Sequence, residues 1–199
     1  MVDSSDNKIK LMLGDCLDRM KEIKGGSVEL ILTDPPYNIS KNNNFNTMGR
    51  VGIDFGEWDK GFDLLGYIKQ APYILNKNGS LIIFNDWKNL GEISRFAESI
   101  GFVIKDMLRW RKANPMPRNI DRRYVTDYEC AVWLVMPKAK WVFNRQKSTY
   151  QRPEFIGSLT KKSEKTGHTT QKPLWLMEEI IKVHTNKEQT ILDPLPFRA

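Results

Sequence analysis

Short apolar runs alternate along the chain with segments whose apolar residues recur every three or four positions. The helical period is clearest at residues 90–100, where the apolar side chains share one face. Weaker helical patterns occupy residues 16–23, 65–75 and 173–184, the last with Pro173 near its first turn. Strands that alternate with helices predict an α/β fold, a mostly parallel sheet with helices on both faces. The apolar runs of strand length are residues 9–15, 28–33, 80–84, 102–110, 128–136 and 190–193.

The remaining segments show no sustained period. Residues 38–60 are rich in Asn and Gly and predict a long loop, and Pro72 predicts a kink in the helix around it. The pair Asn78-Gly79 predicts a turn before the next strand. A basic, irregular stretch covers residues 137 to about 167. Because the chain has no internal repeat and no recognisable linker, residues 1–199 are predicted to form one domain.

Three predicted strands end in an aspartate, namely Asp15, Asp34 and Asp193. In folds of this class, ligands bind beyond the carboxyl ends of the parallel strands. A single aspartate in such a place is as readily a helix N-cap, and Asp15 is equally compatible with that role. Three acids at one edge of a sheet favour a binding site.

The second of these strands leads into Asp34-Pro35-Pro36-Tyr37. The prolines lack an N–H and disfavour helix, so they predict a stiff turn that presents a carboxylate, free carbonyls and an aromatic ring. Two acceptors suit the N–H bonds of a nucleobase amino group, whose lone pair is otherwise delocalised into the ring. Asp34 and the Pro35 carbonyl are candidate acceptors, and Tyr37 is a candidate to stack on an extruded base. The alternative is a rigid connector with a packed tyrosine.

The charge distribution favours a polyanionic partner. The net charge is +7 and the pI is about 9.3. Residues 105–123 hold seven Lys or Arg against two acids, and residues 138–165 hold eight against two, with aromatic residues among them. Such stretches suit phosphate contacts and base stacking, although a solvated basic face has the same composition. The sequence has no apolar run of membrane-spanning length and no signal-peptide core, while two cysteines and two histidines argue against a disulfide framework or a metal site, so a cytoplasmic protein without metal is expected.

These motifs resemble the amino-group DNA methyltransferases. Residues 33–37, "TDPPY", are similar to the family's catalytic motif of the adenine-N6 type, and "GHTTQKPLWLMEEII" resembles its His-Pro-Thr-Gln-Lys-Pro motif, with Thr169 in place of Pro. The "TILDP" segment resembles the start of the family's glycine-rich cofactor loop, and "LGDCLDRMKEI" resembles its opening. The order, with the catalytic motif first and the cofactor loop last, is that of the permuted beta class.

The resemblance implies a Rossmann-like fold and transfer of a methyl group from S-adenosylmethionine (AdoMet) to adenine N6 in DNA, in a bacterial or phage modification system. A homodimer and a cognate restriction endonuclease are expected partners. The alternatives are cytosine-N4 methylation and a non-catalytic DNA-binding remnant. The implied catalytic residues are Asp34, Pro35, Pro36 and Tyr37. The implied cofactor residues are Asp15, Cys16, Asp34, His168, Thr170, Gln171, Lys172, Pro173, Asp193 and Pro194. The implied DNA-binding residues are Asn38, Lys112, Asn114, Arg118, Arg122, Arg123, Lys161 and Lys162.

The resemblance stops after Pro194. The family continues there with a glycine-rich turn, whereas this sequence reads "LPFRA" to residue 199. The expectation is therefore a truncated domain, incomplete at its C-terminus, with an incomplete AdoMet site and little methyl transfer. In the family, target recognition falls between the last strands and the Gln-Lys-Pro motif, which places a short recognition segment at residues 138–166.

Overall fold

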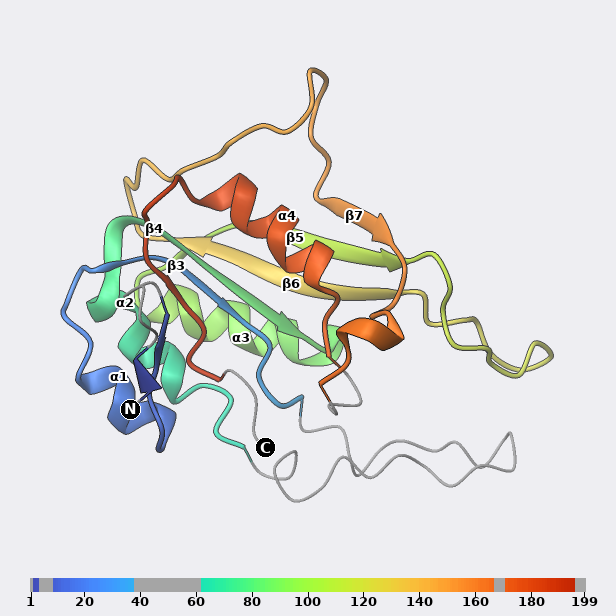
Figure 1. The fold of residues 1–199 in the computed structure, drawn as a ribbon, viewed down its shortest axis with the longest axis horizontal. Helices are drawn as coiled ribbons and strands as arrows, with labels where there is room; N and C mark the ends of the chain where they lie inside the picture. The colour runs from blue at the N-terminus through green and yellow to red at the C-terminus, as the bar shows by residue number, and fades with distance from the viewer. Residues whose placement is uncertain (1, 4–8, 38–61, 167–170, 196–199) are drawn as a thin grey trace.

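The computed structural model describes residues 2–3, 9–37, 62–166 and 171–195 (Figure 1). Strands β1 (Val2–Asp3) and β2 (Lys10–Leu11) form a small antiparallel sheet of their own. The prediction of a longer strand over residues 9–15 within the main sheet is therefore wrong. Leu11 and Leu13 of this apolar run are exposed instead of being covered by a helix.

The main sheet has six strands in the order β7-β5-β6-β4-β3-β8. Neighbouring strands β3 and β4, β3 and β8, and β5 and β7 run parallel, whereas β6 runs antiparallel to both β4 and β5. Five strands thus end at the same edge. The strands are β3 (Val28–Thr33), β4 (Leu75–Asn85), β5 (Val103–Lys112), β6 (Tyr128–Val135), β7 (Glu154–Gly157) and β8 (Ile191–Leu192).

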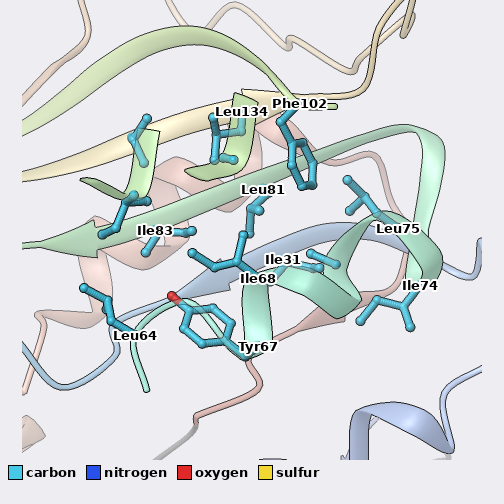
Figure 2. Packing of buried hydrophobic residues seen from close by; sticks show 14 of the residues in the cluster. Ile31, Leu64, Tyr67, Ile68, Ile74, Leu75, Leu81, Ile83, Phe102 and Leu134 are labelled. Atoms are coloured by element: carbon cyan, nitrogen blue, oxygen red, sulfur yellow. The ribbon is translucent and has the colours of Figure 1, made fainter. Parts of the chain in front are cut away.

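Helices cover both faces of this sheet (Figure 1). Alternation along β3 explains the two layers: Ile31 lies in one core, and Leu30 and Leu32 lie in the other. The first core also contains Tyr67, Ile68 and Leu81 (Figure 2). One face is covered by α1 (Cys16–Lys21), the short 3-10 helix η4 (Tyr67–Gln70), α2 (Ala71–Ile74) and α3 (Trp87–Ser99), and the other by α4 (Leu174–His184); the 3-10 helix η5 (Lys162–Glu164) precedes α4.

The region around Pro72 differs from the prediction. The expected helix over 65–75 is split into η4 and α2, and Leu75 already belongs to β4. The expected turn at Asn78-Gly79 lies inside β4, where the register with β3 shifts. A side chain on Gly79 would come within 2.9 Å of the Glu29 carbonyl, so the close approach of two strands explains the glycine that suggested a turn.

Other predicted elements are confirmed, namely the helices at 16–23, 90–100 and 173–184 and the strands at 28–33, 102–110 and 128–136. Strand β7 was missed because it is short and lies at the sheet edge within the irregular stretch. The predicted loop at 38–60 lies outside the described residues. None of the described helices is long and apolar enough to cross a membrane. Among the same residues, no group of His, Cys, Asp or Glu is arranged to hold a metal ion.

Candidate active site

Two of the three predicted acids meet at the carboxyl edge of the sheet. Strands β3 and β8 pair in parallel, with Ile31 opposite Leu192, so Asp193 follows opposite Leu32 and Asp34 leaves the neighbouring strand two residues further along. The Thr33 hydroxyl donates to Asp193 Oδ1 at 2.9 Å. Burial raises the pKa of Asp193 to about 6, against the hydrogen bonds that it accepts. Asp15 does not follow a strand of this sheet; it caps α1, accepting from the Leu17 N–H at 2.8 Å.

The Asp34 carboxylate is held through both of its oxygens. The Tyr37 hydroxyl donates to Oδ1 at 2.7 Å, and Lys172 Nζ donates to Oδ2 at 2.6 Å. Lys172 Nζ also donates to the Tyr37 hydroxyl oxygen at 3.2 Å, which closes a ring of three groups. The turn predicted from the two prolines therefore places the tyrosine against the carboxylate.

Lys172 is the centre of this arrangement. Its side chain is only 6% exposed, and its ammonium lies 3.0 Å from Glu129 Oε2 in addition to its contacts with Asp34 and Tyr37. Burial alone disfavours the charged form, but Asp34 and Glu129 outweigh it, so the pKa of Lys172 lies above its ordinary value. The resemblance assigned Lys172 to the cofactor site; the structure places it beneath the catalytic motif.

Glu129 is a site residue that the sequence did not reveal. It lies near the start of β6, where Oε1 pairs with Lys112 Nζ at 2.8 Å and Oε2 faces Lys172. Burial opposes its ionisation, but Lys172 and Lys112 together lower the pKa of Glu129 to about 2. We call Asp34, Tyr37, Glu129, Lys172 and Lys112 the carboxylate–lysine network. A signal was present in the sequence, because Glu129 is the acid in an otherwise apolar strand.

Two asparagines, one at the end of β4 and one in α3, support the catalytic turn. Asn89 Nδ2 donates to the Tyr37 carbonyl at 2.8 Å and to Asn85 Oδ1 at 2.8 Å. Asn85 ends β4 and also accepts from the Asp86 N–H. The backbone at Tyr37 is therefore tied to the start of α3.

The other predicted cofactor residues are less closely grouped. Gln171 folds back on the segment before it, accepting from Thr166 and donating to the Glu164 carbonyl. Pro173 is the N-cap residue of α4, and Cys16 begins α1. Pro194 is buried directly after Asp193. His168, Thr170 and Asn38 lie outside the described residues.

The predicted DNA residues that the structure describes lie at the same edge as Asp34. Lys112 ends β5 with its charge directed at Glu129. Residues 113–127, which we call the β5–β6 loop, extend beyond the sheet at the carboxyl ends of β5 and β7 (right in Figure 1). Arg122 and Arg123 are exposed on this loop, and Arg118 is half-buried. Asn114 accepts from the Leu159 N–H, and Lys161 and Lys162 are exposed just beyond.

A family model described as DNA methylase, covering the N6 and N4 types, matches residues 28–195. The chain belongs to this family. It is 32% identical over 203 residues to the type II methyltransferase M2.LlaDCHI of Lactococcus lactis subsp. cremoris, covering 92% of this chain and 75% of the relative. It is 33% identical to M2.DpnII of Streptococcus pneumoniae, covering 94% of this chain and 77% of that protein. The predicted family and enzyme class are confirmed.

Solved structures agree with the predicted fold class. The crystal structure of the M1.HpyAVI–SAM complex superposes with a TM-score of 0.70 and 41% sequence identity, over 92% of this chain and 80% of that one. The PvuII DNA methyltransferase, which is cytosine-N4-specific, also has a TM-score of 0.70 but only 15% identity, over 91% of this chain and 72% of that one. The second likeness shows the fold alone. The α/β methyltransferase fold is confirmed.

Proposed function

We propose that this DNA methylase transfers a methyl group from AdoMet to N6 of adenine in DNA. The observation that carries the proposal is the Asp34 carboxylate, held between the Tyr37 hydroxyl and the Lys172 ammonium at the carboxyl edge of the sheet. Both groups leave lone pairs on the carboxylate, because each carboxylate oxygen has two acceptor sites. Asp34 can therefore accept a hydrogen bond from the substrate amine while it keeps its hydrogen bonds with Tyr37 and Lys172.

The residues of the turn have different roles. An adenine that has left the duplex stacks on the ring of Tyr37, while Asp34 and the Pro35 carbonyl accept hydrogen bonds from the two N–H groups of its N6 amine. Both acceptors concentrate electron density on N6, which attacks the methyl carbon as the C–S bond breaks. N6 loses one proton, which Asp34 or water takes up. AdoMet supplies the electrophilic methyl group.

The acidic edge suits a cationic cofactor. AdoMet carries a sulfonium and an ammonium, and Asp34 and Asp193 follow the parallel strands β3 and β8 at one edge, where Asp34 adds to the burial that raises the pKa of Asp193. The Asp193 carboxylate accepts from the Thr33 hydroxyl and the Leu195 N–H, and none of the ion pairs among the described residues gives it a cation. A bound cation would supply that missing charge. We assign Asp193 and Asp34 to the cofactor side of the site.

This assignment predicts a pH-dependent affinity for AdoMet. Burial raises the pKa of Asp193 to about 6, and a cationic ligand favours the ionised form. Affinity is expected to increase as the pH rises through about 6 and to level off above it. Calorimetry from pH 5 to 8 measures this, and Asp193→Asn is expected to flatten the profile. A wild-type profile that is already flat would remove Asp193 from the site.

The choice of adenine over cytosine has its own test. We expect DNA copied with N6-methyl-dATP to take up little label from tritiated AdoMet, since its adenines already carry the methyl group. A copy made with N4-methyl-dCTP is expected to be labelled like unmodified DNA. The reverse pattern would favour cytosine-N4 methylation, and neither copy is expected to change binding through phosphate contacts.

We further propose that DNA lies across the β5–β6 loop and residues 158–166. Both segments adjoin the edge that holds Asp34, and the loop exposes Tyr124 (98%) among its arginines. The predicted recognition segment covers residues 138–166. Its first half follows β6 and therefore lies at the end of the sheet opposite to Asp34. There the Lys140 N–H donates to Asn78, and Asn144 bonds the end of α4. Target recognition is accordingly assigned to the second half of that segment together with the loop.

Salt dependence distinguishes these two surfaces. Replacing Arg122 and Arg123 by glutamine is expected to lower the slope of log affinity against log salt by about 2, one unit for each phosphate contact. The matched control replaces Lys140 and Arg145, which lie at the opposite edge, and is expected to leave the slope unchanged. Fluorescence anisotropy with a labelled duplex gives both slopes. An equal decrease of the slope in the control would mean that DNA binds to the basic residues in general and not to the proposed surface.

Residues 196–199, on which the prediction of an incomplete cofactor loop depends, lie outside the described part of the chain. A homodimer, a cognate restriction endonuclease and a cytoplasmic location are proposed from the family resemblance.

A further inference from the structure

Tyr67 buries a hydroxyl for which the described chain offers no partner. It begins η4, its side chain is 1% exposed, and its oxygen has no hydrogen-bond partner among the described residues. Its ring packs against Ile68, Leu64 and the other apolar residues of the first core (Figure 2). Buried polar groups are nearly always hydrogen-bonded, so a hydroxyl in this position calls for a partner.

Two of the three groups that act electrostatically on this hydroxyl belong to the active edge. The groups that act on it electrostatically are Asp193, Asp34 and Cys16. In Figure 2 its oxygen points toward the side of Ile83 and away from Ile74, the direction in which β4 ends. The aligned ends of β3 and β8 carry the two aspartates on that side. The hydroxyl thus faces the region assigned to the cofactor.

The chemistry of the hydroxyl restricts what it can do there. Burial, followed by Asp193 and Asp34, raises the pKa of Tyr67 well above its ordinary value, so it stays protonated. A protonated phenol can donate one hydrogen bond and accept others. Next to two carboxylates, AdoMet offers an acceptor in the carboxylate of its amino-acid end, whose ammonium these carboxylates would neutralise.

We propose that the Tyr67 hydroxyl donates a hydrogen bond to the amino-acid carboxylate of AdoMet and so forms part of the cofactor site. The inference rests on the proposed function because it takes AdoMet as the ligand. It implies that the same hydroxyl destabilises the ligand-free chain, in which it is buried without a partner, and stabilises the complex. A tyrosine that only fills the core would not act in opposite directions on the two states.

The test compares Tyr67→Phe with the wild type in two measurements. The ligand-free variant is expected to melt about 2–4 °C higher, since it no longer buries an unpaired hydroxyl. Its affinity for S-adenosylhomocysteine, measured by calorimetry, is expected to fall about tenfold. Its affinity for 5′-methylthioadenosine, which lacks the amino-acid end, is expected to stay unchanged. The control is Tyr73→Phe, because Tyr73 is an exposed tyrosine in the adjoining α2.

Each contrary result has a distinct meaning. A ligand-free variant that melts lower would show that the hydroxyl is already bonded within the protein, and the inference would fail. Wild-type binding with unchanged affinity in Tyr67→Phe would overturn this inference alone. Equal losses for both ligands would overturn the assignment to the amino-acid end. A wild-type chain that binds none of these ligands would contradict the proposed cofactor as well.

Discussion

Replacing Lys172 by methionine is expected to lower the free energy of unfolding by about 3–5 kcal/mol at pH 7, the loss typical of removing one partner of a buried ion pair. Methionine keeps most of the volume of the lysine stem but removes the charge that Asp34 and Glu129 share. Urea denaturation measures the change. The control is Lys182→Met in α4, the helix that follows Lys172, where the exposed pair with Glu178 is expected to contribute less than about 1 kcal/mol.

The pH dependence of this loss follows from Glu129. In the wild type its pKa is lowered to about 2, so its contribution to stability is present above its unfolded pKa and disappears as the pH falls toward 2. Without Lys172, only Lys112 opposes the effect of burial on Glu129, so the ionised form of Glu129 becomes less stable. The deficit of Lys172→Met is therefore expected to shrink between pH 7 and pH 4. A deficit that is constant over this range would mean that packing, and not the charge, explains the loss.

A second substitution separates Glu129 from the rest of the network. Adding Glu129→Gln to Lys172→Met removes a carboxylate that has lost one of its two lysine partners, so the double variant is expected to be less destabilised than the sum of the two single variants. Additive losses would indicate that Glu129 and Lys172 do not act on each other. This outcome would also weaken the view that Glu129 helps to hold Lys172 against Asp34.

Replacing Asp34 by asparagine is expected to reduce methyl transfer by about 10²–10³-fold, the range seen when one preorganised polar contact is removed from an active site. An asparagine side chain has one acceptor oxygen and one donor NH2 group. The NH2 group would replace a carboxylate oxygen and would then face another donor, either the substrate amine or the Lys172 ammonium. Affinity for DNA is expected to stay within about twofold, because it depends on phosphate contacts. The control is Asp106→Asn, an exposed aspartate on β5 whose carboxylate accepts from the Met107 N–H.

The sequence predicted the catalytic turn because its information is local. A buried strand, two prolines and a tyrosine within residues 28–37 specify where the carboxylate lies and what stands beside it. The pairing of Glu129 with Lys172 is not local. It depends on β6 and the start of α4 meeting β3 at one edge, an outcome of the strand order that no short window contains.

Other differences have similar causes. Asp15 ends an apolar run, but β2 pairs with β1 outside the main sheet, so the run does not carry Asp15 to the acidic edge as a sheet strand. The sequence did not indicate Tyr67 because a tyrosine within an apolar segment is expected to pack in the core. Its ring does so. It differs from the residues around it in one respect that only the structure shows: its hydroxyl has no hydrogen-bond partner among the described residues.

The most direct test of the central claim identifies the methylated base. Unmethylated DNA is incubated with AdoMet and a molar excess of the protein, so that slow transfer is recorded, and the nucleosides are then separated by mass spectrometry. We expect N6-methyladenine with the wild-type chain, formed about 10²–10³-fold more slowly by Asp34→Asn and at the wild-type rate by Asp106→Asn. N4-methylcytosine as the product, or N6-methyladenine formed by Asp34→Asn at the wild-type rate, would contradict this expectation.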